Sequence, residues 1–403
     1  MNDKLVLREP ISAEKPAPRT TPAHADGVEA ARAGLQAAEL GGESRCQAAH
    51  GQSYPTIRIQ SDPVVMETER PTIRNSDAVH VEISSDDYEQ FAGLHRSVPL
   101  DPNADFENFF EEARLRFHEF PRWIRRILLR FSTRGSSHGA MVIHGFPLDE
   151  VVPPTPTSPD HHLEKPYHAS EFWLSCVAGA LGEPVAYLPE KEGRIFQDVY
   201  PTRVNEANLS SESSSILLDF HTEIAFHPLM PDYLLLYCLR QDRDGVARTL
   251  VSCIRRFLPR LTPGVQDVLF TNQFRAGVDY SFGNLKQKSG AGPLVAVLYG
   301  DRLDPFLRYD LDLMVGESPS AQHALQAVRL AVNAYREEII LAPGSLMIID
   351  NRRTVHARSQ FKAYYDGTDR WLQRLAVVRD LEASLRDRVR GSRVIATDFS
   401  AFL

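Results

Sequence analysis

The sequence predicts a mixed α/β protein with helices in its first half and a β-sandwich or jelly roll in its second half. In the first half, apolar residues recur at three- and four-residue steps, which is typical of amphipathic helices. In the second half, short β-rich runs follow one another and are separated by turn residues. This pattern favours a sandwich or jelly roll over a doubly wound parallel sheet.

The first 75 residues differ in composition from the rest of the chain. They are rich in Ala, Pro, Glu, Gly and Thr and contain almost no aromatic side chains. A segment of this kind cannot bury enough apolar surface to order itself. We therefore expect a disordered tail over residues 1–75 and a single folded domain over residues 76–403.

The folded part should begin with an edge strand over residues 78–84, where apolar and polar residues alternate. The apolar positions of "DFENFFEEARLRFHEF" follow at helical spacing and predict a helix that ends before Pro121. The segment "RWIRRILLRF" predicts a second helix, and "GAMVIHGFP" predicts a buried strand. The segment "ASEFWLSCVAGALGEPVAY" predicts a helix that ends at Gly182 and leads into a strand.

Six β-rich runs follow in the second half: "LLLYCL", "TLVSCI", "LVAVLYG", "FLRYDLDLM", "EEIILAPGSLMIID" and "QRLAVVRD". Turn residues such as "RDG" and "APG" separate them. The segment "SAQHALQAVRLAVNAYREE" is the one helical pattern among these strands. The strands are too short and too closely spaced for a fold in which each is followed by its own helix.

The composition argues against several classes of partner. The formal charge of −8 is spread in mixed-sign runs, and no Lys/Arg block offers a site for nucleic-acid phosphates. No run approaches the roughly 18 apolar residues of a membrane span, and the first residues lack the pattern of a secretory signal. The four cysteines show no CxxC spacing. We expect a cytoplasmic protein that binds a small molecule rather than nucleic acid or a membrane.

His221 and Glu223 lie two residues apart in the apolar stretch "ILLDFHTEIAFHPLMPDY". In an extended strand such residues point to the same side, so both could bind one metal ion. The spacing alone is weak, because a histidine precedes an acidic residue in the same way at His24, His80 and His162. A metal site therefore needs a third ligand from elsewhere in the chain.

His356, in "SLMIIDNRRTVHARSQF", is the best candidate for that third ligand. Two histidines and one carboxylate leave three positions open on Fe(II), which suits an oxygenase that binds a chelating cosubstrate and O₂. Arg370 follows 14 residues later and could bind the distal carboxylate of 2-oxoglutarate through paired hydrogen bonds. His323 is a weaker candidate, because it lies in the helical segment and has Glu337 at the same offset.

Three long motifs, "FHTEIAFHPLMPDYLLLYCLR", "LMIIDNRRTVHARSQF" and "YYDGTDRWLQRLAVVRDL", together resemble the clavaminate synthase-like branch of the Fe(II)/2-oxoglutarate oxygenases. The branch includes hydroxylases of free asparagine and arginine, and the resemblance covers roughly residues 78–385. It implies a double-stranded β-helix (jelly roll) core flanked by helices. It also implies that Fe(II), 2-oxoglutarate and O₂ take part in the reaction.

Matched to the motifs of that family, His221, Glu223 and His356 are the implied iron ligands and catalytic residues. Arg370 is the implied partner of the 2-oxoglutarate C5 carboxylate. Thr249, in "GVARTLVS", matches a threonine that forms a hydrogen bond with the cosubstrate.

The resemblance also implies four contacts to the amino-acid substrate. Gln197, in "RIFQDVYP", matches a glutamine that holds the amino-acid backbone, and Arg374 matches an arginine that binds the substrate carboxylate. Asp310, in "LRYDLDLM", matches an acidic residue that reads the substrate side chain. Glu223 would face the α-amine while it binds iron.

The sequence departs from the family pattern in two places. Arginine hydroxylases of this kind carry two acidic residues on the strand that holds Asp310, but Arg308 occupies the first of these positions. The segment between Gln197 and His221 is short and rich in serine, although in the family it covers the substrate. Both departures concern the substrate side of the site.

The sequence thus predicts a 2-oxoglutarate-dependent hydroxylase that oxidises C3 or C4 of a free polar or basic L-amino acid, with an arginine-like substrate as the first expectation, in specialised-metabolite or antibiotic biosynthesis. The same chemistry could instead yield desaturation or cyclisation, or act on an amino acid tethered to a carrier protein. A third hypothesis is a jelly roll without catalytic activity that serves as a binding module.

Overall fold

The computed structural model describes residues 80–399 except for residues 160–164, 166, 280–281 and 283–288. The predicted tail over residues 1–75 lies outside this part of the chain. Among the described residues, no helix is long and apolar enough to cross a membrane. Cys176, Cys238 and Cys253 are free thiols in the interior, where cysteine packs as a small apolar residue.

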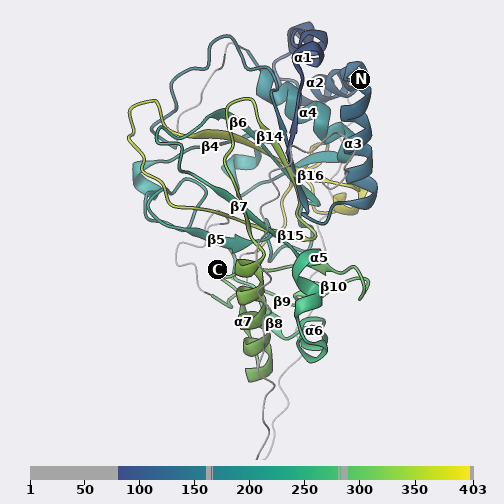
Figure 1. Ribbon diagram of the computed structural model, residues 1–403, viewed down its shortest axis with the longest axis vertical. Coiled ribbons are helices and arrows are strands. Elements are labelled where there is room, and N and C mark those ends of the chain that lie inside the picture. Colours follow the sequence, from purple (N-terminus) through teal and green to yellow (C-terminus); the bar gives the residue numbers. More distant parts are fainter. Residues whose placement is uncertain (1–79, 160–164, 166, 280–281, 283–288, 400–403) are drawn as a thin grey trace, which may run out of the picture. The chain divides into compact units, whose positions relative to one another are not determined.

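Figure 1 shows a large twisted sheet at the centre of the described part of the chain. Its strands follow the order β1-β2-β14-β6-β16-β3-β17, and β4 also pairs with β16. All pairings are antiparallel except β1 with β2 and β17 with β3. The strands are β1 (His80–Glu82), β2 (Ala140–His144), β3 (Glu183–Tyr187), β4 (Gln197–Val199), β6 (Tyr233–Arg240), β14 (Leu346–Asp350), β16 (Trp371–Val378) and β17 (Val394–Ile395).

A second, antiparallel sheet has the order β13-β7-β15-β5. These strands are β5 (Leu218–His221), β7 (Thr249–Cys253), β13 (Glu337–Ile339) and β15 (Thr354–Arg358). Apolar side chains of both sheets belong to one buried cluster, which includes Leu236 and Met347 of the large sheet and Val251 and Ile339 of the small one. The two sheets therefore pack against each other through this cluster.

The predicted helices of the first half cover the large sheet and lie together in Figure 1. They are α2 (Phe106–Arg116), α3 (Arg122–Arg134) and α4 (Ala169–Leu181), and a shorter helix, α1 (Ser85–Phe91), precedes them. Phe109, Leu128 and Trp173 pack in one cluster with Tyr233 and Leu375 of the sheet. The mixed α/β prediction is thereby confirmed, and the first half contributes a helical layer.

The remaining elements form a separate layer between β7 and β13 along the chain. Its helices are α5 (Ile254–Phe257), α6 (Pro263–Leu269) and α7 (Pro319–Ala334). Its strands are β8 (Phe274–Arg275), β9 (Leu294–Val295), β10 (Leu298–Tyr299), β11 (Phe306–Leu307) and β12 (Val315–Gly316).

Short 3₁₀ helices lie at Leu94–Ser97, Phe117–Glu119, Lys191–Gly193, Arg203–Asn205, Leu258–Arg260 and Glu382–Ser384.

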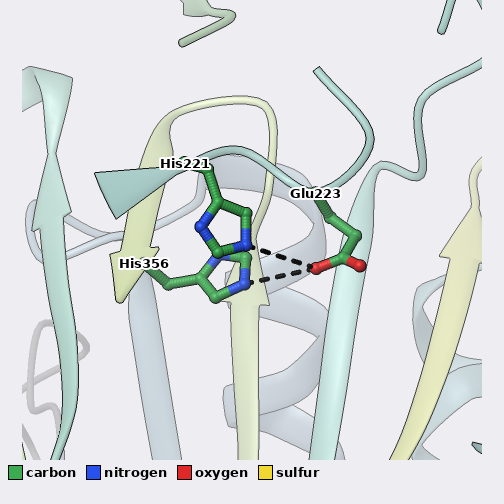
Figure 2. A group of neighbouring side chains, drawn as sticks. All are labelled: His221, Glu223 and His356. Carbon is green, nitrogen blue, oxygen red and sulfur yellow. Dashed lines mark ion pairs between the residues drawn. The ribbon is translucent and has the colours of Figure 1, made fainter. Parts of the chain in front are cut away.

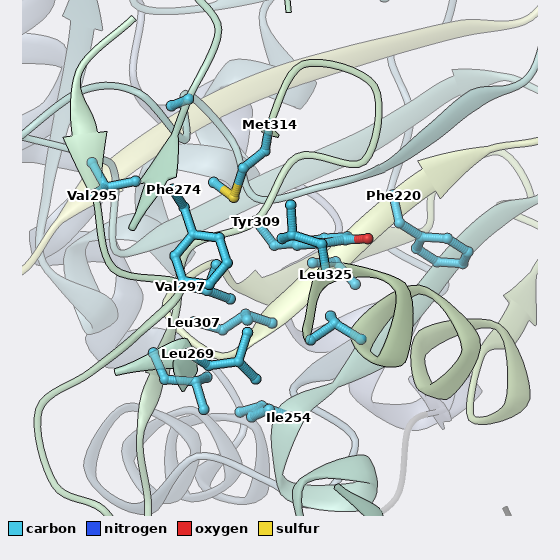
Figure 3. Close-up of a cluster of buried hydrophobic side chains, with 14 of the residues drawn as sticks. Phe220, Ile254, Leu269, Phe274, Val295, Val297, Leu307, Tyr309, Met314 and Leu325 are labelled. Carbon is cyan, nitrogen blue, oxygen red and sulfur yellow. The ribbon is translucent and has the colours of Figure 1, made fainter. Parts of the chain in front are cut away.

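Two strand predictions are wrong in this layer. The runs "LVAVLYG" and "FLRYDLDLM" form only two-residue strands, and Asp310 lies outside them in an isolated bridge with His221. Their apolar residues, among them Val297, Leu307 and Tyr309, instead belong to a compact buried cluster that also includes Phe274 and Leu325 (Figure 3). Burial among loops and helices thus accounts for hydrophobicity that the sequence pattern assigns to strands.

Candidate active site

Strand pairing brings the two candidate histidines together. β15 lies antiparallel to β5, and in this register His356 is directly opposite His221. The rings are 4.3 Å apart between their centroids. Residues that face each other across an antiparallel pair have neighbouring side chains, so the register of this ladder fixes the histidine pair.

Glu223 reaches the same point from a turn, not from the strand that the sequence suggests. β5 ends at His221, and Ile224 adopts a positive φ of 55°, which turns the chain sharply after Glu223. The backbone N–H of Glu223 donates to Asn351 Oδ1 at 2.7 Å, and Asn351 Nδ2 donates back to the Glu223 carbonyl at 3.2 Å. Asn351 therefore holds the strained turn in place.

The side chains of His221, Glu223 and His356 point toward one another (Figure 2). Glu223 Oε2 is 3.3 Å from His356 Nε2 and 4.0 Å from His221 Nε2. One ligand atom of each residue lies within 4.8 Å of the other two. Among the described residues this is the one cluster of histidine, cysteine and carboxylate groups with metal-binding geometry.

The donor set fits a divalent transition metal. His221 Nδ1 lies 2.8 Å from the backbone carbonyl of Asp219, a contact in which Nδ1 carries the proton and leaves Nε2 free as a ligand. Burial, and next the charge of His221, lower the pKa of His356 to about 4, so its ring is neutral at pH 7. Burial would raise the pKa of Glu223, but Arg374 and the two histidines hold it below its ordinary value.

Arg370 and Thr249 lie together, and Thr249 is on β7, the strand that pairs with the His356 strand β15. Arg370 precedes β16, Thr249 begins β7, and Arg370 Nη2 donates to Thr249 Oγ1 at 3.2 Å. Both residues are buried, and among the described residues Arg370 forms no ion pair, although the charge of Asp242 acts on it from farther away. A buried guanidinium that is not held in an ion pair is suited to bind an anionic ligand.

Arg374 and Gln197 also meet, but both are already engaged with other groups. Arg374 Nε donates to Gln197 Oε1 at 3.0 Å, Nη1 donates to Glu223 Oε1 at 2.5 Å, and Nη2 contacts Glu190 Oε1 at 3.1 Å. The pairing of β16 with β4 places Arg374 opposite Gln197 and accounts for their contact. Glu190 is a member of this group that the sequence analysis did not identify.

A cavity opens beside the three clustered residues and is strongly acidic. Its lining comprises the carboxylates of Glu190, Asp219, Glu223, Asp279, Asp310 and Asp312, together with His221, Arg374, Leu209, Ser210, Ser211, Leu218 and Leu313. Asp310 lies next to His221, because Thr222 N–H donates to the Tyr309 carbonyl and Leu311 N–H donates to that of Phe220. Burial raises the pKa of Asp310 to about 6, although the nearby His221 acts in the opposite direction.

Arg308, which departs from the family pattern, and His227, which lies close to the proposed ligands in the sequence, are both outside this cavity. Arg308 is absent from the lining, and its guanidinium lies 5.7 Å from the centre of the Tyr299 ring. His227 is buried, and its Nδ1 accepts the N–H of Leu229 at 2.9 Å. Burial lowers the pKa of His227 to about 4, so it is a neutral structural group.

Four residues near the site are missing from the predictions made from the sequence. Asp279 and Asp312 stand alone among ordinary acidic residues, Glu190 lies in the turn "PEKEG", and Arg358 is one of three arginines near His356. Asp312 lies two residues beyond Asp310, and this is the one spacing that could have drawn attention to it. Only the packing of distant segments places the other three at the cavity or beside it.

Two curated relatives are similar over most of the chain. Clavaminate synthase 2 of Streptomyces clavuligerus is 35% identical over 309 residues, which cover 76% of this chain and 95% of that protein. L-asparagine oxygenase of Streptomyces coelicolor is 39% identical over 281 residues, which cover 70% of this chain and 83% of that protein.

A solved structure shows the same likeness in three dimensions. The non-heme iron oxygenase OrfP in complex with Fe, succinate and (3S)-hydroxy-L-Arg superposes with a TM-score of 0.72 and 28% identity, over 79% of this chain and 99% of that one. Residues 132–376 match the family described as taurine catabolism dioxygenase TauD, TfdA family. The chain therefore belongs to the TauD/TfdA family of dioxygenases.

Proposed function

We propose that this protein is an Fe(II)- and 2-oxoglutarate-dependent hydroxylase of a free L-amino acid whose side chain is positively charged, such as arginine. The two facing sheets would form the double-stranded β-helix (jelly roll) of a single domain over residues 76–403. The oxidised carbon would be C3 or C4. The product would serve the biosynthesis of a specialised metabolite.

The acidic lining of the cavity is the observation that carries the choice of substrate. Six carboxylates line it, and Arg374 is the one arginine or lysine among the lining residues. A guanidinium or ammonium group entering this cavity would gain favourable interactions with Asp279, Asp310 and Asp312. A neutral carboxamide would leave their charges without compensation. Arg308, the residue that put guanidinium recognition in doubt, lies elsewhere.

His221, Glu223 and His356 would hold Fe(II), with Nε2 of each imidazole and a carboxylate oxygen as donors. Bound iron would supply O₂ activation coupled to the oxidative decarboxylation of 2-oxoglutarate. Arg370 would pair with the distal carboxylate of 2-oxoglutarate, and the Thr249 hydroxyl would donate to the same group. The interior position of both residues keeps water away from that ion pair.

Arg374, Gln197 and Glu190 would bind the head of the amino acid. Arg374 now donates to Glu223, so a metal ion that draws the Glu223 carboxylate away would release one guanidinium N–H for the substrate carboxylate. The substrate α-amine would then face Glu190 and Glu223. If the head group is fixed beside Glu223 and the side chain extends toward Asp310, C3 and C4 are the carbons nearest to the three ligand residues.

Product masses from a panel of L-amino acids would test the proposal. The full chain is incubated with Fe(II), 2-oxoglutarate, ascorbate and one amino acid at a time. We expect a gain of one oxygen atom with arginine or another basic amino acid, together with succinate. Loss of two hydrogen atoms would favour desaturation or cyclisation. Turnover of asparagine but of no basic amino acid would overturn the substrate assignment.

A further inference from the structure

Arg358 is a second buried arginine close to the residues proposed to bind 2-oxoglutarate. It lies on β15, two residues after His356, and its backbone pairs with Thr249 of β7. Thr249 in turn accepts the hydrogen bond from Arg370, so Thr249 stands between the two arginines. The positive charge of Arg370 also acts on Arg358 across this short stretch of the interior.

The Arg358 guanidinium contacts no carboxylate in the described part of the chain. Nη2 donates to Ser213 Oγ at 2.6 Å and to the Ile216 carbonyl at 3.3 Å, and Nη1 donates to the Ser359 carbonyl at 3.3 Å. Nε is buried and has no hydrogen-bond partner. With only 6% of its surface exposed, Arg358 is a buried cation whose charge neutral groups alone solvate.

Two of the three described hydrogen-bond partners of Arg358, Ser213 and Ile216, belong to the serine-rich segment 209–216, which forms one wall of the acidic cavity. Ser210 and Ser211 line the cavity, whereas Ser213 and Ser214 are turned inward and are only 1% exposed. The Ser214 carbonyl accepts the N–H of Phe361, which provides a second attachment to the chain after β15. Arg358 is therefore the charged side chain that joins the proposed dicarboxylate pocket to the wall of the amino-acid cavity.

We propose that Arg358 is a positioning residue that couples binding of 2-oxoglutarate to the ordering of segment 209–216. This inference rests on the proposed function, because it requires a dicarboxylate beside Arg370. Without that anion, Arg358 and Arg370 repel each other. The charge of Asp242 acts on Arg370, but among the described residues no acidic group contacts Arg358. A bound dicarboxylate supplies the missing negative charge, so that Arg358 stays in the position from which it holds Ser213 and Ile216.

Hydrogen exchange of the backbone amides of segment 209–216 tests the coupling without turnover. The full chain, loaded with Fe(II) under anaerobic conditions, is compared with and without saturating 2-oxoglutarate. In the wild type we expect the cosubstrate to slow exchange in this segment at least about tenfold. In Arg358→Gln, saturating 2-oxoglutarate should leave the exchange rate unchanged. Arg358→Lys should bind 2-oxoglutarate like the wild type and still lack protection, because the shorter lysine has one nitrogen and cannot bond Ser213 and Ile216 at one point and the Ser359 carbonyl at another, as the two-pronged guanidinium does.

Two further variants separate the coupling from a general loss of structure. Ser213→Ala should weaken protection and leave the affinity for 2-oxoglutarate unchanged. Arg240→Gln is the matched control, because Arg240 also donates to neutral groups, Thr155 and the carbonyls of Val152 and Pro153, away from segment 209–216. It should behave like the wild type. Wild-type protection in Arg358→Gln, or bound 2-oxoglutarate without protection in the wild type, would overturn the coupling. Failure of the wild type to bind 2-oxoglutarate would instead overturn the proposed function beneath it.

Discussion

The two ends of the site are built in different ways. The end that holds His221, His356 and Thr249 is made of neighbouring strands, in which pairing register decides which side chains meet, and Arg370 joins it from the residue before β16. Much of the acidic end lies outside regular strands: Asp279, Asp310 and Asp312 are in loops or turns, and Ser210 is in the serine-rich segment, although Asp219 comes from β5. Register is set locally by the ladder, whereas the position of a loop depends on everything packed beneath it.

This difference suggests a division of labour. The strand end would carry the iron and the cosubstrate, which are common to the whole reaction class. The loop end would carry substrate choice, because it can change without disturbing the ladder. The buried cluster around Phe274, Leu307 and Leu325 supports the loop that holds Asp310, so that layer of the molecule determines the shape of the acidic end. Substitutions at the two ends should therefore have separable effects.

Removal of an iron ligand should have the largest effect. We expect His356→Ala to weaken iron retention by more than about 100-fold and to abolish succinate formation, since changes around a ligand alone cost 10- to 100-fold. Iron content after gel filtration and succinate release measure the two effects. His323→Ala is the matched control, because His323 lies on the exposed side of α7. Iron retained at full stoichiometry in His356→Ala would contradict the ligand assignment.

Loss of the Arg370 charge should weaken binding of 2-oxoglutarate far more than binding of the amino acid. Arg370→Gln removes a buried cation from the proposed carboxylate pair, and we expect the KM for 2-oxoglutarate to rise about 100-fold, or about 3 kcal/mol. The affinity for the amino acid should change far less. Steady-state kinetics with each substrate varied in turn provide the measurement. An equal loss for both substrates would show that the two ends are not separable.

Substitutions at the acidic end should weaken binding of the amino acid and leave binding of 2-oxoglutarate unchanged. In Asp310→Asn and Asp279→Asn we expect the affinity for L-arginine to fall about 10- to 100-fold, because each variant removes one charge that faces the substrate. The Kd for 2-oxoglutarate should stay within about twofold of the wild-type value. Calorimetric titration of the anaerobic protein measures both affinities. Unchanged binding of L-arginine in both variants would remove these residues from the substrate site.

The smallest effect belongs to Thr249. Thr249→Val keeps the shape of a β-branched side chain on β7 and deletes one hydroxyl, so the KM for 2-oxoglutarate should rise about threefold to tenfold. The variant should unfold at the same temperature as the wild type, which thermal unfolding would verify. A loss as large as that of Arg370→Gln would assign Thr249 a greater part in cosubstrate binding than one hydrogen bond.

The same division explains how much of the molecule the sequence could predict. The helices before Pro121 and up to Gly182 follow from apolar spacing, and the major strands follow from their β-rich runs. His221, Glu223 and His356 were predicted together, although Glu223 comes from a turn that Ile224 shapes. The strands expected around Asp310 were wrong, because their apolar residues fill the cluster of Figure 3.

Glu190, Asp279 and Arg358 show what sequence reasoning could not reach. Each stands in a segment without a distinctive pattern. Glu190 and Arg358 contact residues far away in the chain, and Asp279 lines a cavity built from distant segments. Arg358 meets Ser213, a residue 145 positions earlier, and Glu190 meets Arg374, a residue 184 positions later. No periodicity within one segment encodes such a meeting.

The most direct test of the account compares L-arginine with L-citrulline, which has nearly the same shape and no charge. The measurement is kcat/KM for Fe(II)-dependent succinate formation by the full wild-type chain, with each amino acid supplied separately. The account predicts that L-arginine is preferred by at least about tenfold, which corresponds to about 1.4 kcal/mol from the charge facing Asp310 and Asp279. Equal rates, or a preference for L-citrulline, would contradict it.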